Sequence, residues 1–356
     1  MSQTTFTPEE SQALAENYNV LLRMVCLPGG LIGLYFLAHP WPSAHPVVMV
    51  GWTLFTAYFL FCWTSCFHET AHQTLSDSKP LSIALGRCLG VAMFVPYTCY
   101  RESHIRHHAY LNKPTDWELW PYSDPNTSIW FRRVFVWFDL LVGIFMSPWI
   151  YSRIYFHKDS PLKSPEVRRA IRNEYLAMIA FWGLVLGLVA YYNAWLPFLT
   201  VWCIPHFLAG VFQSGRKLTE HLGMASYDPM LGTRTVLSKN NWITKIGSFV
   251  NFDIFIHGPH HRHPRVAHNV LGQKMDEYIQ AHPGAEYPLF RNYWRATCAM
   301  LPHMVKNPGV GMNVGAPPPT KAKNENVENF VSDVSAEVLA EEEVEVKGPT
   351  IASSGW

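Results

Sequence analysis

Residues 46–72 read "PVVMVGWTLFTAYFLFCWTSCFHETAH". The stretch 46–66 is almost entirely apolar, and as a helix it is long enough to cross the ~30 Å hydrocarbon core of a bilayer. Two histidines, His68 and His72, follow this stretch at a separation of four residues. Because positions i and i+4 share one face of a helix, we expect both imidazoles to point the same way from the end of a membrane-spanning helix.

The composition of the whole chain agrees with a membrane protein. Of its 356 residues 49% are hydrophobic and 15% are charged, whereas soluble domains carry about 25% charged residues. Four apolar runs are long enough and clean enough to span a bilayer: 18–37, 46–66, 175–193 and 195–214. The sequence therefore predicts an all-α integral membrane protein with four transmembrane helices.

The distribution of basic residues predicts how these helices are oriented. The connections 38–46 and 191–197 contain no lysine or arginine, whereas residues 151–174 contain six. Positive charge marks the cytoplasmic side of short loops. We therefore expect two helical hairpins with their tips outside and a histidine-rich cap on the cytoplasmic face.

Two further apolar runs do not fit this topology as single spans. A crossing by 134–150 would place the six basic residues that follow it on the wrong side, so we expect this run to lie in the interface or to re-enter, with Gly143 and Pro148 as bending points. Run 81–99 contains Arg87, and we expect it to stay near the surface as well.

The ends of the chain differ in composition from its body. Residues 1–17 lack the basic start of a signal peptide, and "TPEE" at 7–10 predicts the beginning of a cytoplasmic helix. Residues 18–310 form the predicted membrane domain. The stretch 311–356 has a net charge of −5 and few large apolar residues, which predicts a disordered acidic tail. The seven scattered cysteines are expected to be reduced packing residues.

Two more histidine clusters follow the first one. "HIRHH" at 104–108 and "HGPHH" at 257–261 share the spacing HxxHH, and "KLTEHLGM" adds His221 after the fourth apolar run. The predicted topology places all of them on one face of the membrane. We therefore predict nine metal ligands: His68, His72, His104, His107, His108, His221, His257, His260 and His261. Imidazole suits zinc, copper, iron or nickel, and nine imidazoles are too many for one ion, so the count predicts two ions.

Other polar residues near the clusters have expected roles outside this set. Acids beside the boxes are either partners for the outer N–H groups of ligand imidazoles or solvated surface residues: Glu69, Glu102, Asp116, Glu118, Glu220 and Asp253. His206 lies in the middle of the fourth apolar run, about 15 Å by helical rise from Arg216. This depth favours the wall of a substrate tunnel over a metal ligand.

The order HxxxH, HxxHH, HxxHH around two membrane hairpins resembles the membrane fatty acid desaturase superfamily, which includes acyl desaturases, carotenoid hydroxylases and ketolases. "HHAYLNKPTD", with Asn112 and Asp116, resembles the second box of that family. "TEHLG" is similar to a segment that supplies an extra histidine ligand in alkane hydroxylases, which supports His221. The resemblance implies two iron ions, O2 activation and oxidation of an unactivated C–H bond.

These features predict an oxidoreductase that desaturates a fatty acyl chain. The alternative within the family is a hydroxylase or ketolase of a carotenoid, alkane or other lipid. A different hypothesis is a metal transporter or store, which the intramembrane His206 favours. No GxGxxG fingerprint occurs, so we expect electrons from an external donor such as ferredoxin or cytochrome b5, docked on a body with a net charge of +6 that also suits anionic membrane lipids. No nucleic-acid partner is expected.

Overall fold

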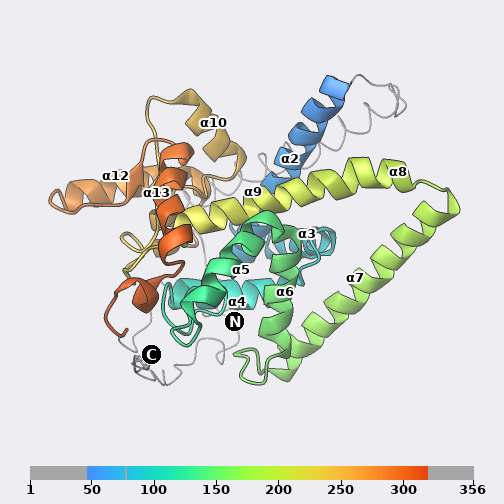
Figure 1. The fold of residues 1–356 in the computed structure, drawn as a ribbon, viewed down its shortest axis with the longest axis horizontal. Helices are drawn as coiled ribbons and strands as arrows, with labels where there is room; N and C mark the ends of the chain where they lie inside the picture. The colour runs from blue at the N-terminus through green and yellow to red at the C-terminus, as the bar shows by residue number, and fades with distance from the viewer. Residues whose placement is uncertain (1–45, 77, 320–356) are drawn as a thin grey trace, which may run out of the picture.

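The computed structural model describes residues 46–76 and 78–319, and this part of the chain is almost entirely helical (Figure 1). Its strands form one short parallel pair, β1 (Thr235–Val236) and β2 (Leu289–Phe290), in which Thr235 is opposite Leu289. The predicted all-α class is therefore confirmed. The predicted helix within 1–17 and the predicted span 18–37 lie outside the described residues.

Three long helical stretches carry the apolar runs. They are α2 (Pro46–His72), α7 (Pro165–Tyr191), and a continuous run from Trp195 to His221 made of α8 (Trp195–Phe198), the π-helical turn η1 (Leu199–Cys203) and α9 (Ile204–His221). Each stretch has 27 residues and a mean hydropathy between 1.5 and 1.7 over its most apolar part. All three are long and apolar enough to cross a membrane, as predicted for 46–66, 175–193 and 195–214.

The two remaining apolar runs form sharply bent helix pairs. Helices α3 (Lys79–Ala92) and α4 (Tyr97–Ala109) meet at 104°, and α5 (Ile129–Leu141) and α6 (Gly143–Phe156) meet at 120°. Each pair has the form of a broken span or a re-entrant loop, so the described residues contain between three and five candidate spans. The bend at Gly143 agrees with the prediction. Pro148 lies inside α6, away from this bend, and its role as a bending point stays a prediction.

Glycine explains how closely α6 approaches α9. A Cβ atom on Gly143 would lie 2.5 Å from the carbonyl oxygen of Gly210, and one on Gly210 would lie 2.5 Å from the backbone nitrogen of Ile144. Real side chains do not tolerate such contacts, so only glycine allows the two backbones to meet here. The start of α6 is thereby held directly against the middle of α9.

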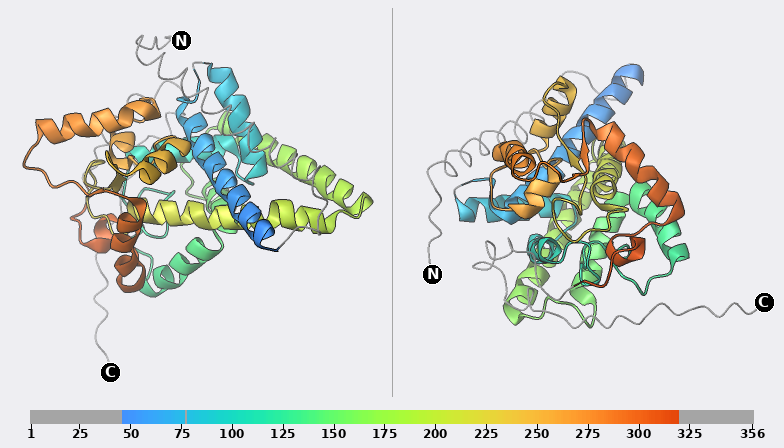
Figure 2. Two further views of the ribbon diagram at one scale, coloured as in Figure 1. Left: turned by 90° about the horizontal axis from the view of Figure 1, so that it is seen from above. Right: turned by 90° about the vertical axis from the view of Figure 1, so that its left-hand side faces the viewer.

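α9 packs along α2, and α4, α5 and α6 pack around this pair (Figures 1 and 2). A buried core beneath the C-terminal half of α2 combines residues of α2, α4 and α6, among them Cys66, Phe67, Tyr100 and Ile154. The N-terminal part of α2 and the joined tips of α7 and α8 project away from this core (Figure 1), and their apolar side chains are exposed.

The C-terminal third covers the end of the bundle where α9 terminates (Figure 1). It consists of α10 (Trp242–Val250), α11 (His257–Arg262), η2 (His268–Val270), α12 (Leu271–Ala281), α13 (Tyr293–Lys306) and η3 (Gly311–Val314). Residues 311–319 contact the loop between α4 and α5, where the Asn313 side-chain amide donates to the carbonyl oxygen of Tyr122 at 2.7 Å. The rest of the predicted tail, 320–356, lies outside the described residues. The six cysteines of the described part are free thiols.

Candidate metal centre

All nine histidines predicted as ligands lie in one buried cluster. Five of them offer nitrogen atoms that lie within 4.8 Å of one another: His68, His72, His104, His108 and His260. We call these the first group. The remaining four, His107, His221, His257 and His261, form two overlapping sets that share His221, one of which also includes Glu220. We call these four histidines the second group.

Helical spacing produces the contacts within each box. The Nε2 atoms of His68 and His72 lie 3.3 Å apart on the last turn of α2, and those of His104 and His108 lie 3.2 Å apart on α4. In both pairs the residues are four positions apart, so they share one helix face. The predicted pairing of His68 with His72 is thus confirmed.

Packing between helices joins the boxes to one another. The Nε2 atom of His104 lies 3.1 Å from that of His72, and the Nε2 atom of His257 lies 2.9 Å from that of His221. With metal–nitrogen bonds of about 2.1 Å, neighbouring ligands of an octahedral ion lie about 3.0 Å apart. The observed separations match this value. The spacing of these nitrogen atoms therefore fits the coordination of metal ions by the cluster.

Carboxylates bond three of the imidazoles from the outer side. The Nδ1 atom of His104 lies 3.0 Å from Glu118, and that of His107 lies 2.8 Å from Asp116. Glu69 lies 3.3 Å from the Nδ1 atom of His68. Such contacts fix the tautomer of an imidazole and leave its Nε2 atom free to bind a metal. For these acids, the expected bonding to outer N–H groups is confirmed.

The other three acids have different partners. Asp253 lies 2.7 Å from the Nδ1 atom of His268, and Glu102 lies 3.4 Å from Arg101. Glu220 approaches an Nε2 atom, that of His257, at 3.5 Å. Glu69, Glu102, Asp116 and Glu220 are each at most 3% exposed, so the solvated surface alternative is wrong for them.

Burial also sets the protonation of the cluster. The pKa values of His257, His260 and His261 are lowered, first by burial and then by the neighbouring histidines, which disfavour a further positive charge. These imidazoles are therefore neutral, as metal ligands must be. Burial alone would raise the pKa of Glu118, but the facing His104 lowers it to about 2, so this carboxylate stays charged.

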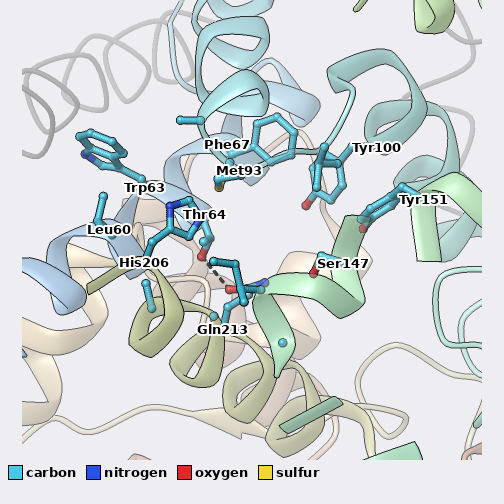
Figure 3. Close-up of a pocket in the computed structure, with 16 residues that line it drawn as sticks. Leu60, Trp63, Thr64, Phe67, Met93, Tyr100, Ser147, Tyr151, His206 and Gln213 are labelled. Carbon is cyan, nitrogen blue, oxygen red and sulfur yellow. Dashed lines mark hydrogen bonds between the residues drawn. The ribbon is translucent and has the colours of Figure 1, made fainter. Parts of the chain in front are cut away.

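An apolar cavity lies beside the cluster, between α2, α6 and α9 (Figure 3). Leu60, Trp63, Phe67 and Met93 form apolar parts of its wall. His206 also lines it, so its predicted place in a cavity wall is confirmed. The polar lining includes Thr64, Ser147 and Gln213, and the Thr64 hydroxyl donates to Gln213 Oε1 at 2.6 Å.

A second, more polar cavity lies next to the first and reaches the histidines. The two cavities share Tyr100, Ser147, Tyr151 and Gln213 as lining residues, and the second one reaches His68, His104 and His257. Tyr100, Tyr151 and Gln213 were not predicted from the sequence. Only Tyr100 could have been found from the sequence. It lies four residues before His104 and therefore shares one helix face with this predicted ligand.

Comparison with known proteins places this arrangement in a family. A sequence model of the fatty acid desaturase family matches residues 44–294, which include every histidine of the cluster. The chain belongs to the fatty acid desaturase family. This desaturase is therefore an oxidoreductase rather than a metal transporter or store, as the three histidine boxes predicted.

Two curated relatives are similar to this desaturase over most of its length, and a third is similar over a shorter segment. The sn-1 acyl-lipid omega-3 desaturase (ferredoxin) of Synechocystis sp. is 24% identical over 81% of this chain and 83% of the relative. The chloroplastic omega-6 fatty acid desaturase of Brassica napus is 22% identical over 66% of this chain and 54% of the relative. A fatty acid desaturase of Bacillus subtilis is 30% identical over 27% of this chain.

Proposed function

We propose that this desaturase introduces a double bond into the fatty acyl chain of a membrane lipid, using O2 and electrons from an external donor. The observation that carries the proposal is that the two cavities lie side by side and share four lining residues. Tyr100 lines both an apolar cavity and the adjacent, more polar cavity that reaches His68 and His104. A substrate chain in these cavities would meet the histidine cluster along its length.

The nine histidines of the cluster are the proposed ligands of two iron ions. The first group would hold one ion and the second group the other. Two irons bound there would supply, with O2 and electrons, an oxidant strong enough for an unactivated C–H bond. Glu118, Asp116 and Glu69 would keep His104, His107 and His68 in the tautomer that binds metal through Nε2.

The residues that line the cavities would bury the substrate chain and position it. Leu60, Phe67 and Met93 bury the hydrocarbon and exclude water from it, which protects the reacting carbons from side reactions. Tyr100 and Tyr151 line the junction of the two cavities. We propose that they fix which carbon atoms face the ions, because small displacements of a reacting group cost large factors in rate.

The membrane arrangement and the electron donor are further parts of the proposal. We propose four spans in two hairpins, with the centre on the cytoplasmic face, because α2 and α9 both end at the cluster. The name of the Synechocystis relative specifies ferredoxin, and an acidic carrier of that kind suits the basic segment between α6 and the middle of α7. Its exposed cations are Lys158, Lys163, Arg169 and Arg172.

Lipid profiling tests the proposed function. We expect a host that expresses the wild-type chain to accumulate an acyl chain with one additional double bond. His107→Ala removes a second-group donor and should abolish this product, whereas His282→Ala changes an exposed histidine remote from the cluster and should not. A hydroxylated product would instead support the hydroxylase alternative. An unchanged product in His107→Ala would separate the activity from the histidine cluster.

A further inference from the structure

The carboxylates around the histidine cluster differ in which side of the imidazoles they face. Glu69, Asp116 and Glu118 each contact an Nδ1 atom. The Nε2 atoms are the ones that converge, since the short contacts between boxes join Nε2 to Nε2. These three carboxylates therefore stand behind the rings, on the side away from the space that an ion would occupy.

Glu220 stands on the opposite side. Its Oε2 atom lies 3.5 Å from the Nε2 atom of His257. One oxygen of Glu220 and one nitrogen each of His221 and His257 lie within 4.8 Å of one another, and all three residues are buried. Among the acids of the described residues, Glu220 is the one whose carboxylate belongs to a set of converging donors with these histidines.

The two groups are also unequal without Glu220. The five imidazoles of the first group form one converging set, whereas the four of the second group are divided between a set of three histidines and a set of two histidines with Glu220. We propose that Glu220 is the fifth donor of the second group and binds its ion through a carboxylate oxygen, an inference that rests on the proposed di-iron function. The centre would then consist of one ion with nitrogen ligands alone and one ion with a mixed nitrogen and oxygen set.

A buried arginine holds the Glu220 carboxylate in place. Arg216 Nη1 lies 3.3 and 3.4 Å from the two oxygens of Glu220, one helical turn away on α9. The Nε atom of Arg216 donates to Gln213 Oε1, which also accepts from Thr64. Because a carboxylate has about four lone-pair sites, Glu220 can accept from Arg216 and still bind an ion. Arg216 also links the position of Glu220 to the wall of the apolar cavity.

Charge balance favours a carboxylate ligand in this buried site. Neutral imidazoles bring no negative charge, so two divalent ions would add four positive charges to a buried site. Buried charge is costly unless opposite charge lies close to it. The outer carboxylates act through an imidazole ring, whereas Glu220 would contact its ion directly. Through direct contact, the negative charge of Glu220 would offset part of the positive charge of the second ion, which has fewer imidazole ligands than the first.

Metal content and Mössbauer spectra of the purified protein test this inference. The wild-type chain loaded with ⁵⁷Fe should hold two irons and show two quadrupole doublets of equal area. Glu220→Gln should lose about one iron per chain on dialysis against a chelator, and the doublet of the second group should disappear. Glu118→Gln is the matched control, because it removes the same charge from the outer side of a ring, and it should leave the second-group doublet in place.

A double variant separates a ligand from a counter-charge. If Glu220 only neutralises Arg216, then Arg216→Gln combined with Glu220→Gln should restore two irons per chain. If Glu220 binds the ion, the double variant should remain at one iron, while Glu220→Asp, which keeps a carboxylate, should retain more iron than Glu220→Gln. Two irons and two unchanged doublets in Glu220→Gln would overturn the inference. A wild-type chain with two irons but no lipid product would overturn the proposed function alone, and one that binds no iron would overturn both.

Discussion

The ring of Tyr100 stacks on the imidazole of His104, with centroids 5.1 Å apart and ring planes within 11° of parallel. One of these residues lines the apolar cavity and the other belongs to the first group of histidines. A substrate chain and a bound ion would thus meet across a single pair of stacked rings. The position of Tyr100 should therefore decide where along the chain oxidation occurs.

Shortening Tyr100 should change both the rate and the position of oxidation. Tyr100→Ala removes the stacked ring, so the substrate can shift relative to the ions, and we expect turnover to fall by about 10²-fold with double bonds at more than one position. Tyr100→Phe keeps the ring and should retain the wild-type position. Mass spectrometry of derivatised acyl chains locates the double bonds. A single unchanged position in Tyr100→Ala would show that the ring does not set it.

Removing the charge of Glu118 should weaken the hold on iron. Glu118→Gln leaves His104 without its anionic partner, and outer partners of this kind contribute about 10- to 100-fold in metal affinity. Competition with a chelator measures the difference. Affinity equal to that of the wild type would mean that the tautomer of His104 is fixed by other contacts.

The same residue predicts a pH dependence in metal-free protein. The pKa of Glu118 is lowered from 4.5 to about 2, so its charged form stabilises the fold fully above pH 4.5 and this stabilisation is lost as the pH falls toward 2. We expect the Tm of the wild type to exceed that of Glu118→Gln at pH 5. The gap should narrow between pH 4.5 and 3. A gap of constant size down to pH 3 would contradict the lowered pKa.

His206 should affect the choice of substrate without affecting the metal. It lines the apolar cavity and lies 15 residues before His221, which is about 22 Å along a helix. We expect His206→Ala to keep two irons per chain and to accept longer acyl chains than the wild type. Product profiles from mixed-length lipids, together with iron analysis, measure both effects. Loss of an iron would identify His206 as part of the centre.

The contact between α6 and α9 should not tolerate a methyl group. Gly210→Ala would force a Cβ atom against the backbone of Ile144, and overpacking of this kind costs about 1–3 kcal/mol. Gly183→Ala on α7 is the control, because no atom lies within 4 Å of the Cβ position there, and it should change stability by no more than about 1 kcal/mol. Thermal unfolding in detergent compares them. Equal Tm values would show that the two helices can separate at little cost.

Local spacing and run length made much of this structure predictable from sequence. The i, i+4 relation of His68 and His72 is a property of any helix, and the length of run 195–214 is enough to indicate a span. The angle between α5 and α6 cannot be predicted from local spacing or run length. Gly143 and Pro148 both permit a bend, and the bend occurs at Gly143 because α9 offers Gly210 for close contact there.

The side from which an acid approaches a ring could not be predicted either. Glu118 lies 14 residues after His104 and meets its Nδ1 atom because the loop after α4 folds back. Glu220 directly precedes His221, yet it faces the Nε2 atom of His257 from another helix. These differences depend on tertiary packing and side-chain rotamers, which box spacing does not specify. Tyr151 and Gln213 were missed for the same reason, since each reaches the cavity junction only after α6 packs on α9.

The donors come from four segments, the ends of α2, α4 and α9 and the short α11, spread between residues 68 and 261. Most of the polypeptide must therefore be synthesised before the proposed ions could bind. Iron insertion would then be a finishing step of biogenesis. In cells starved of iron, the metal-free protein should be less stable and should be degraded by quality-control proteases.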